Sequence, residues 1–279
     1  MLLALSAGPV ASDALDGRST PVVASVATWS WLGWTAALVA MLLPRTSSLT
    51  VVRVLVPAGW MATIAAVAVG DDITALDALA LVAATGALVF ALAPWVTDTF
   101  VDGSSYGPER RIALRTPLVL TLLATITEAV VVLGASVGIL LLASRQWAAG
   151  AAGVLLGAAV VFLGVRSIHQ LSRRWLVLVP TGMVIHDPLV MPEPQLFLRQ
   201  TMARLGPAET DADEALVTQD LTAGASGLVL SLTLSEPVEL LVPAGRGETT
   251  LHSVDRVLFS PALPTELLAE GRKRRLPVA

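Results

Sequence analysis

The chain has 279 residues, of which 54% are hydrophobic and only 14% are charged, and its formal net charge is −4. Soluble proteins average about 25% charged residues, so much of this chain is expected to avoid water, and the negative charge argues against a nucleic-acid binder. Because there is no cysteine, disulfides, thiolate metal sites and a cysteine nucleophile are excluded.

The charges are unevenly distributed along the chain. The last 109 residues, 171–279, carry 23 of the 40 charged side chains. This division predicts a lipid-facing part up to residue 170 and a water-soluble domain after it. Residues 1–21 lack the positive region of a signal peptide, so we interpret them as a short extracytoplasmic tail or, alternatively, as a misassigned start.

Five apolar blocks follow the tail, and each is long enough for a helix that crosses the hydrocarbon core, which takes about 20 residues. No sustained strand alternation is present, so a barrel is not expected. The predicted α-helical bundle therefore has five membrane spans within residues 22–170, at 22–43, 51–70, 75–97, 117–142 and 147–167.

Arginine counting predicts the orientation of the spans. One face of the predicted bundle carries Arg18 and Arg145, whereas the other carries eight arginines: Arg45, Arg53, Arg110, Arg111, Arg115, Arg166, Arg173 and Arg174. The positive-inside rule places the second face in the cytoplasm. We expect a multi-pass protein of the plasma membrane with its N-terminus outside and its C-terminus inside.

Glu128 is the one acidic residue in the middle of a span, in the run "LLATITEAVVVLGASVG" (122–138). A charge near the bilayer centre costs about 2.5–3.5 kcal/mol or more. Thr121 and Thr125 lie on the same helix face and are candidate hydrogen-bond partners. The carboxyl group is either a proton or ion site, or a neutral acid that fixes helix packing.

Spans four and five carry glycines at the spacing of close helix packing. The set comprises Gly134, Gly138, Gly150, Gly153, Gly157 and Gly164. Small residues allow two helix backbones to approach closely. They predict packing within the bundle or, alternatively, a dimer interface that would make the protein a homo-oligomer.

Basic residues cluster at the predicted cytoplasmic face and at the C-terminus. They fix the topology or bind anionic lipid headgroups, each contributing about 1 kcal/mol to membrane binding. The candidates for lipid contact are Arg110, Arg111, Arg115, Arg173, Arg174, Arg272, Lys273, Arg274 and Arg275.

The C-terminal domain, 171–279, is predicted to be α+β, with mainly antiparallel strands and one closing helix. "WLVLV" and "MVIHD" flank a Pro-Thr-Gly turn and predict a hairpin over 175–187. Further predicted strands are 195–199, 215–221, 227–234, 238–242 and 254–259, and the closing helix is predicted over 264–275.

The segment "RRWLVLVPTGMVIHD", directly after a membrane span, resembles the start of the bacterial pleckstrin-homology-like domains of small membrane proteins. The resemblance covers residues 172–275. It implies a strongly bent seven-stranded sheet with a C-terminal capping helix, in a scaffold or interaction domain without a known ligand. Phosphoinositide binding is not implied, because no basic-loop motif is present.

No catalytic, nucleotide-binding or metal-binding motif occurs in the sequence, and the three histidines, His169, His186 and His252, are not at ligand spacing. We therefore predict a non-enzymatic protein without cofactor or metal, whose cytoplasmic domain is a scaffold or regulatory module of a membrane complex. Its expected partners are the lipid bilayer and another protein. The alternative is a transporter subunit or small permease that uses Glu128.

Overall fold

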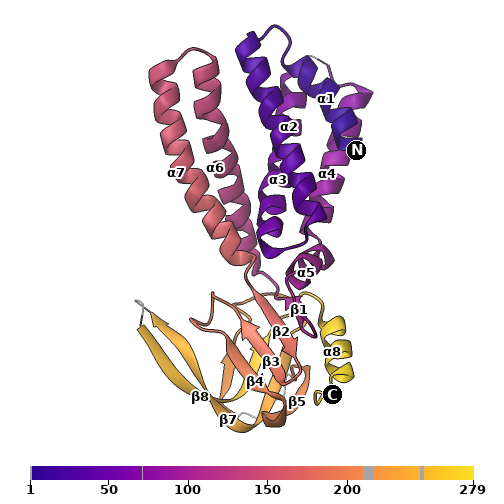
Figure 1. Cartoon of the computed structure of the whole chain (residues 1–279), viewed down its shortest axis with the longest axis vertical. Coiled ribbons are helices and arrows are strands. Elements are labelled where there is room, and N and C mark those ends of the chain that lie inside the picture. The colour runs from indigo at the N-terminus through magenta and orange to yellow at the C-terminus, as the bar shows by residue number, and fades with distance from the viewer. Residues whose placement is uncertain (1, 71, 210–215, 246–247) are drawn as a thin grey trace. The chain divides into compact units, whose positions relative to one another are not determined.

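The computed structural model describes residues 2–70, 72–209, 216–245 and 248–279 (Figure 1). The chain divides into two compact units. A helical unit is built from the residues up to Leu43 together with 47–96 and 123–169. A sheet unit is built from 44–46, 97–122 and 170–279. Neither unit is one continuous stretch of chain.

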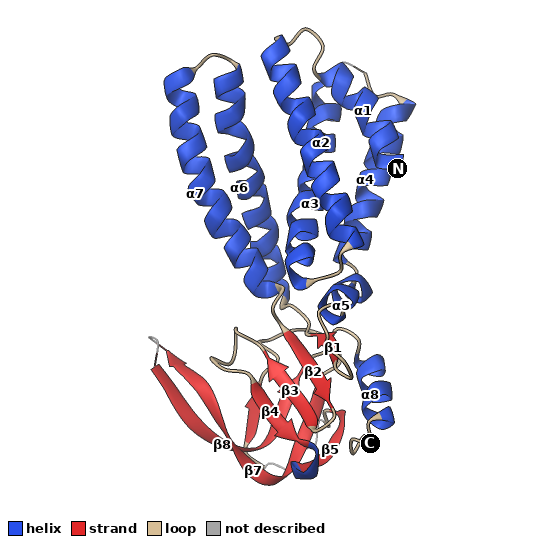
Figure 2. Ribbon diagram, in the orientation of Figure 1, coloured by secondary structure: helices blue, strands red, loops and turns tan. Residues whose placement is uncertain are grey.

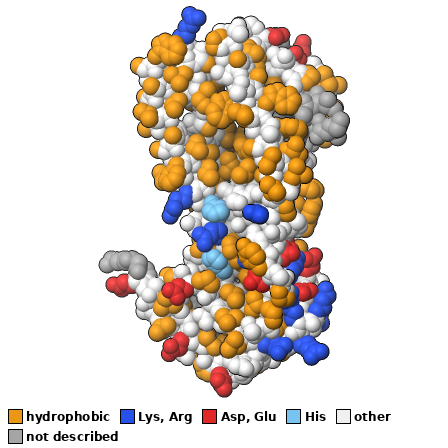
Figure 3. Space-filling view, in the orientation of Figure 1, with side chains coloured by type: hydrophobic (Ala, Val, Ile, Leu, Met, Phe, Trp, Pro, Cys, Tyr) orange, Lys and Arg blue, Asp and Glu red, His pale blue; other side chains and the backbone are white. Residues whose placement is uncertain are grey.

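Among the described residues, five helices are long and apolar enough to cross a membrane. They are α2 (Thr20–Leu42), α3 (Thr46–Val69), α4 (Ala75–Leu92), α6 (Leu118–Ala143) and α7 (Trp147–Leu171). The predicted number of long apolar helices is confirmed. Hydrophobic side chains dominate the surface of the helical unit in the view of Figure 3, as expected for a surface in contact with lipid.

The third span is shorter than the predicted 75–97. Its start is fixed by a capping box, in which the Thr74 hydroxyl accepts from the Asp77 backbone N–H and the Asp77 carboxylate accepts from the Thr74 backbone N–H. It ends at Leu92 because Pro94 disfavours a helical conformation at Ala93. Pro94 then begins a separate short helix, α5 (Pro94–Asp102).

The residues predicted as an extracytoplasmic tail contain a helix, α1 (Leu2–Ala14), that packs against α4. Val10 of this helix is buried. Its apolar residues are too few to span a membrane, which is why the sequence showed no element there. Residues 1–21 are thus partly helical.

Close backbone contact joins α6 to α7, which lie side by side in Figure 2. A Cβ atom on Gly157 would overlap the backbone carbonyl of Gly134, and one on Gly153 would come within 2.8 Å of the Gly138 Cα. Cβ atoms on Gly150 and Gly164 would collide with side chains of the facing helix. The six glycines are therefore used for packing between α6 and α7 of the same chain.

The first sheet of the sheet unit has the order β1-β2-β3-β4 and is antiparallel throughout. Its strands are β1 (Arg110–Ala113), β2 (Trp175–Val179), β3 (Gly182–His186) and β4 (Gln195–Leu198). The hairpin of β2 and β3 confirms the predicted one, with Pro180 and Thr181 between the paired Val179 and Gly182. Gly182 is required because a Cβ there would overlap the Phe197 carbonyl.

The second sheet has the order β5-β7-β8-β6. Its strands are β5 (Met202–Pro207), β6 (Thr218–Asp220), β7 (Leu230–Gly245) and β8 (Glu248–Phe259). A 3₁₀ turn (Arg199–Thr201) precedes β5, and the helix α8 (Pro264–Lys273) closes the fold. The predicted strands 227–234 and 238–242 form one long strand, β7, and β5 was not predicted.

One hydrophobic core holds the two sheets and α8 together. It contains Leu176 and Ile185 of the first sheet, Leu232 and Phe259 of the second, and Leu267 of α8, all at 0% exposure. Burying such side chains is the main favourable contribution to folding, at about 1.5–3 kcal/mol each.

The sequence analysis predicts no strand between the spans 75–97 and 117–142 and is wrong there, because β1 lies in this segment. Arg110–Ala113 pairs with β2, and Ile112 and Leu114 are buried in the core of the sheet unit. Residues 97–122 belong to the same compact unit as 170–279. The α6–α7 hairpin is thus inserted between two neighbouring strands of one sheet, and the domain does not begin at residue 171.

We predict that Gly157→Val destabilises the helical unit by about 1–3 kcal/mol, because the valine side chain would push α7 away from α6. The matched control is Gly86→Val in α4, where a Cβ meets no atom within 4 Å. The free energy of unfolding of the two purified variants in mild detergent is the measurement. Equal stability of the variants would contradict the close packing.

We also predict that residues 94–115 are required for the sheet unit to fold. The Leu114 N–H donates to the Arg174 carbonyl, so an Asn-Gly turn can join Arg115 to Arg174 in place of 116–173. This joined chain should be soluble and unfold cooperatively in circular dichroism. A chain of 171–279 alone should not, because it exposes the edge of β2 and lacks Ile112 and Leu114. An independently folded 171–279 would refute the requirement.

Candidate functional site

The candidate intramembrane site centres on Glu128, which is buried at 6% exposure in α6. Its carboxylate interacts electrostatically with the half-buried guanidinium of Arg53 in α3. Arg53 lies two turns after the start of α3, and Glu128 lies three turns after the start of α6. The first residues of both helices belong to the sheet unit. The partner of Glu128 is therefore a basic residue of another span, which the sequence analysis did not predict.

The predicted threonine partners have other contacts. The Thr121 hydroxyl donates to the Pro117 carbonyl, 3.1 Å away, within its own helix. Thr125 has an interaction of its own. A threonine on a helix commonly bonds the carbonyl four residues earlier, which satisfies its hydroxyl locally.

A second polar contact joins α3 to α7 in the helical unit. Thr50, at 5% exposure, lies one turn before Arg53, and its hydroxyl is 2.8 Å from Nδ1 of His169. Three spans thus contribute polar groups, namely α3, α6 and α7. Glu128 is not the isolated intramembrane polar residue that the sequence suggested.

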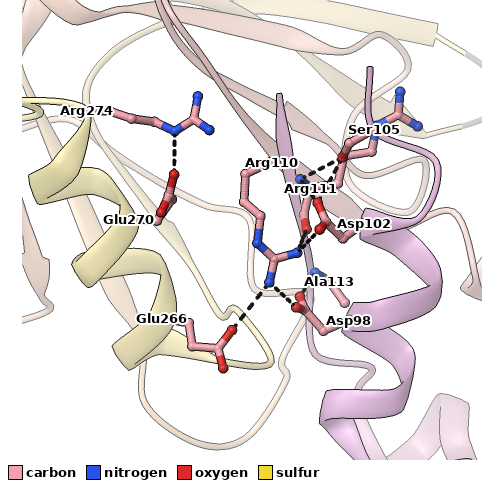
Figure 4. A network of polar contacts seen from close by, with 9 residues as sticks. All are labelled: Asp98, Asp102, Ser105, Arg110, Arg111, Ala113, Glu266, Glu270 and Arg274. Atoms are coloured by element: carbon pink, nitrogen blue, oxygen red, sulfur yellow. Dashed lines mark hydrogen bonds and ion pairs between the residues drawn. The ribbon is translucent and has the colours of Figure 1, made fainter. Parts of the chain in front are cut away.

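The predicted lipid-binding arginines differ in how they are used, and Arg110 is the clearest case (Figure 4). Its guanidinium pairs with Asp98 at 2.6 Å, Asp102 at 2.8 Å and Glu266 at 3.3 Å. Burial raises the pKa of the Asp98 carboxyl above its usual range, which Arg110 opposes. Arg110 therefore joins α5, β1 and α8 within the sheet unit.

Three further arginines are also held by internal contacts. Arg174 forms a buried ion pair with Asp187 at 2.6 Å and donates to the Arg115 carbonyl. Arg115 itself donates to the carbonyls of Pro261 and Ser226. Arg274 pairs with Glu270 at 3.0 Å and donates to the carbonyls of Pro108 and Leu178. These side chains stabilise the fold and are not available to lipid.

The remaining basic residues of the predicted set are more accessible. Arg173, Arg272, Lys273 and Arg275 are exposed, and Arg111 is half-buried. Lys273 pairs with Glu270 at 3.1 Å, and Arg272 donates to the carbonyl of Ala279. Arg111 lies in β1, and Arg173 lies two residues before β2. Arg272 and Lys273 are the last residues of α8, and Arg275 follows that helix. The sequence cluster "RKRR" is thus divided by the inward-facing Arg274.

His186 and its neighbour Asp187 contact different residues. Asp187 is held by Arg174, while the His186 ring packs edge-on against Trp175 with 4.8 Å between centroids. Burial, reinforced by the positive charges of Arg173 and Arg111, lowers the pKa of His186, although Asp187 opposes this. Groups of three or more metal-ligating side chains are absent among the described residues.

No protein-family model, no curated protein and no solved structure matches the chain. The candidate sites therefore rest on their own geometry.

We predict that Arg53 and Glu128 are energetically coupled. Arg53→Gln or Glu128→Gln alone should lower the free energy of unfolding by about 3–5 kcal/mol, because each removes one charge of a buried, oppositely charged pair. The double variant should lose less than the sum of the two losses. Stability is measured by unfolding in a denaturing detergent, with the exposed Arg166→Gln as the control. Additive losses would show that the two residues do not interact.

Proposed function

We propose that this chain is a non-enzymatic, multi-pass membrane protein whose sheet unit lies in the cytoplasm and serves as a scaffold or regulatory module of a membrane complex. The observation that carries the proposal is the insertion of the α6–α7 hairpin between β1 and β2. A protein bound to such a sheet is joined to the membrane by two covalent connections on adjacent strands. This arrangement suits a module that holds or senses a partner at the membrane.

The pairing of β1 with β2 supports the proposed topology independently of charge counting. Ala113 lies opposite Trp175, so the chain must return to the side from which it left after α6 and α7. Pro44 also belongs to the sheet unit, where it packs against Gly103, and it connects α2 to α3. Two loops, 44–46 and 97–117, and the chain after α7 all belong to the sheet unit, which agrees with five spans and opposite termini. The excess of arginines on that side favours the cytoplasm.

Similarity to the pleckstrin-homology-like fold supports an interaction role. Among the described residues, 172–275 contain seven strands, β2–β8, followed by the helix α8, which are the number of strands and the closing element that the resemblance implies. Three features depart from the implied single sheet. The described strands form two four-stranded sheets, β1 adds an eighth strand, and β6 pairs with β8 in parallel. Packing of α8 on the shared core is the feature that most favours a capping helix.

The absence of cysteine allows a direct test, because any cysteine introduced into the full chain is unique. In intact cells, an impermeant maleimide should label Gln146→Cys between α6 and α7. The exposed Glu236→Cys on β7 should react only after permeabilisation. Labelling of Glu236→Cys in intact cells would overturn the orientation.

The same two variants test the scaffold role when they carry a photoactivated crosslinker on the cysteine. A module that binds a cytoplasmic partner should give a discrete crosslinked product from position 236 in native membranes. Position 146 should not give that product. Absence of a product from position 236, and from further exposed positions on both sheets, would contradict the scaffold role.

Transport is the second candidate function, and the polar residues of three spans favour it. Polar groups occur at Glu128 in the middle of α6, at Arg53 in α3, and at the contact between Thr50 of α3 and His169 near the end of α7. Intramembrane ionisable residues are candidates for function. Proton or solute flux in proteoliposomes that is abolished in Glu128→Gln, with the variant still folded, would favour transport over a scaffold role.

A further inference from the structure

A cluster of aromatic and basic side chains lies on the first sheet and on the loop before it. We call it the aromatic-basic cluster, and it comprises Tyr106, Arg111, Arg173, Trp175 and His186. The Arg111 guanidinium lies 5.8 Å from the centroids of both the Tyr106 and Trp175 rings, a distance at which a cation is attracted to an aromatic face. Trp175 in turn packs against His186, its partner in the sheet.

Arg111 is the arginine of β1 whose hydrogen-bonding capacity is least used. Its Nη2 atom is 3.5 Å from the Glu109 carboxylate, and its Nε atom has no acceptor among the described residues but is buried, so an external anion would contact the terminal nitrogens. By contrast, its neighbour Arg110 has three acidic partners. Arg173 is exposed. An anion could therefore bind Arg111 and Arg173 without breaking a short internal ion pair.

The cluster holds two neighbouring positive charges. Arg173 and Arg111 both act on His186 as such charges. Three acids lie near the cluster, Glu109, Asp102 and Asp187. Asp187 is buried and pairs with Arg174, and Asp102 pairs with Arg110. Among the described residues, Glu109 is therefore the carboxylate paired with the Arg111 guanidinium that an external anion would compete with.

Chain connectivity keeps the cluster near the lipid. The apolar helix α7 ends at Leu171, and Trp175 follows four residues later, at most about 14 Å of extended chain. Trp175 pairs with Ala113, which is five residues before the start of α6. Tryptophan, tyrosine and arginine are the residues that favour the headgroup region of a bilayer, because each combines an apolar body with a polar group.

From this geometry we infer that the aromatic-basic cluster binds the phosphate headgroup of an anionic phospholipid, with Arg111 and Arg173 contacting the phosphate and Trp175 contacting the apolar region below it. The inference rests on the proposed insertion of the five helices in a membrane. It selects two of the predicted lipid-binding arginines, and it adds three aromatic residues that the sequence analysis did not assign to lipid binding.

Native mass spectrometry of the full-length protein tests the inference. The protein is purified in mild detergent and mixed with equal amounts of phosphatidylglycerol and phosphatidylcholine that have the same acyl chains. The wild type should retain phosphatidylglycerol in preference. Each arginine should contribute about fivefold to this preference, the value expected for one basic residue at a membrane surface.

Matched variants identify the site. Arg173→Gln removes an exposed charge and should weaken the preference about fivefold without unfolding the protein. Arg111→Gln combined with Arg173→Gln should abolish it. Arg272→Gln combined with Lys273→Gln removes two exposed charges outside the cluster and should leave the preference unchanged. If the pair at 272 and 273 carries the preference, or if the wild type shows none, the inference is wrong.

Two further measurements distinguish a lipid headgroup from free phosphate, and failure of the lipid site from failure of the proposed topology. Inorganic phosphate at 20 mM, at constant ionic strength, should not displace the bound phosphatidylglycerol. Displacement would show that the cluster binds a soluble phosphate and would overturn the lipid assignment. The cysteine-labelling pattern at positions 146 and 236 is independent of lipid type. If that pattern holds while lipid preference is absent, the lipid site fails and the proposed topology stands.

Discussion

The pairing of β1 with β2 is the interaction on which the arrangement of this chain depends. The two strands are separated in sequence by a helical hairpin of two apolar spans, yet they pair over four residues from Arg110 to Ala113. Ile112 and Leu114 are buried in the same core as residues of the second sheet and α8. Folding of the sheet unit therefore requires that α6 and α7 return the chain to the side from which it left. The hairpin is a continuous element inserted into a discontinuous domain.

Close packing and charge pairing have separate roles in the two units. In the helical unit, α6 and α7 approach through glycine backbones, an arrangement that works in lipid because it depends on van der Waals contact and not on the exclusion of water. In the sheet unit, arginines join segments that are distant in the sequence. Arg110 contacts α5 and α8, and the buried pair of Arg174 with Asp187 lies next to the entry into β2.

Because of these internal contacts, the arginine excess at one face cannot be attributed to membrane topology or lipid binding alone. Part of the excess is structural, because Arg110, Arg115, Arg174 and Arg274 have acceptors within the sheet unit. The arginines that remain exposed, together with Trp175 and Tyr106, are the ones with chemistry suited to a lipid surface. Charged residues also have partners inside the helical unit, where Glu128 of α6 has a basic neighbour, Arg53, on α3.

The sequence by itself determined the five spans, the β2–β3 hairpin and the closing helix. Each depends on local properties: a window of about 20 apolar residues, strand-forming runs on either side of a turn, and an amphipathic C-terminal segment. Only the tertiary structure decided the role of "RRIA" at β1, the separation of structural from exposed arginines, and the partner of Glu128. Four residues carry too little periodicity to show a strand whose partner begins 62 residues after the end of β1. The acceptors of Arg110 and Arg274 include residues 156 and 166 positions away, and no local pattern encodes contacts at that separation.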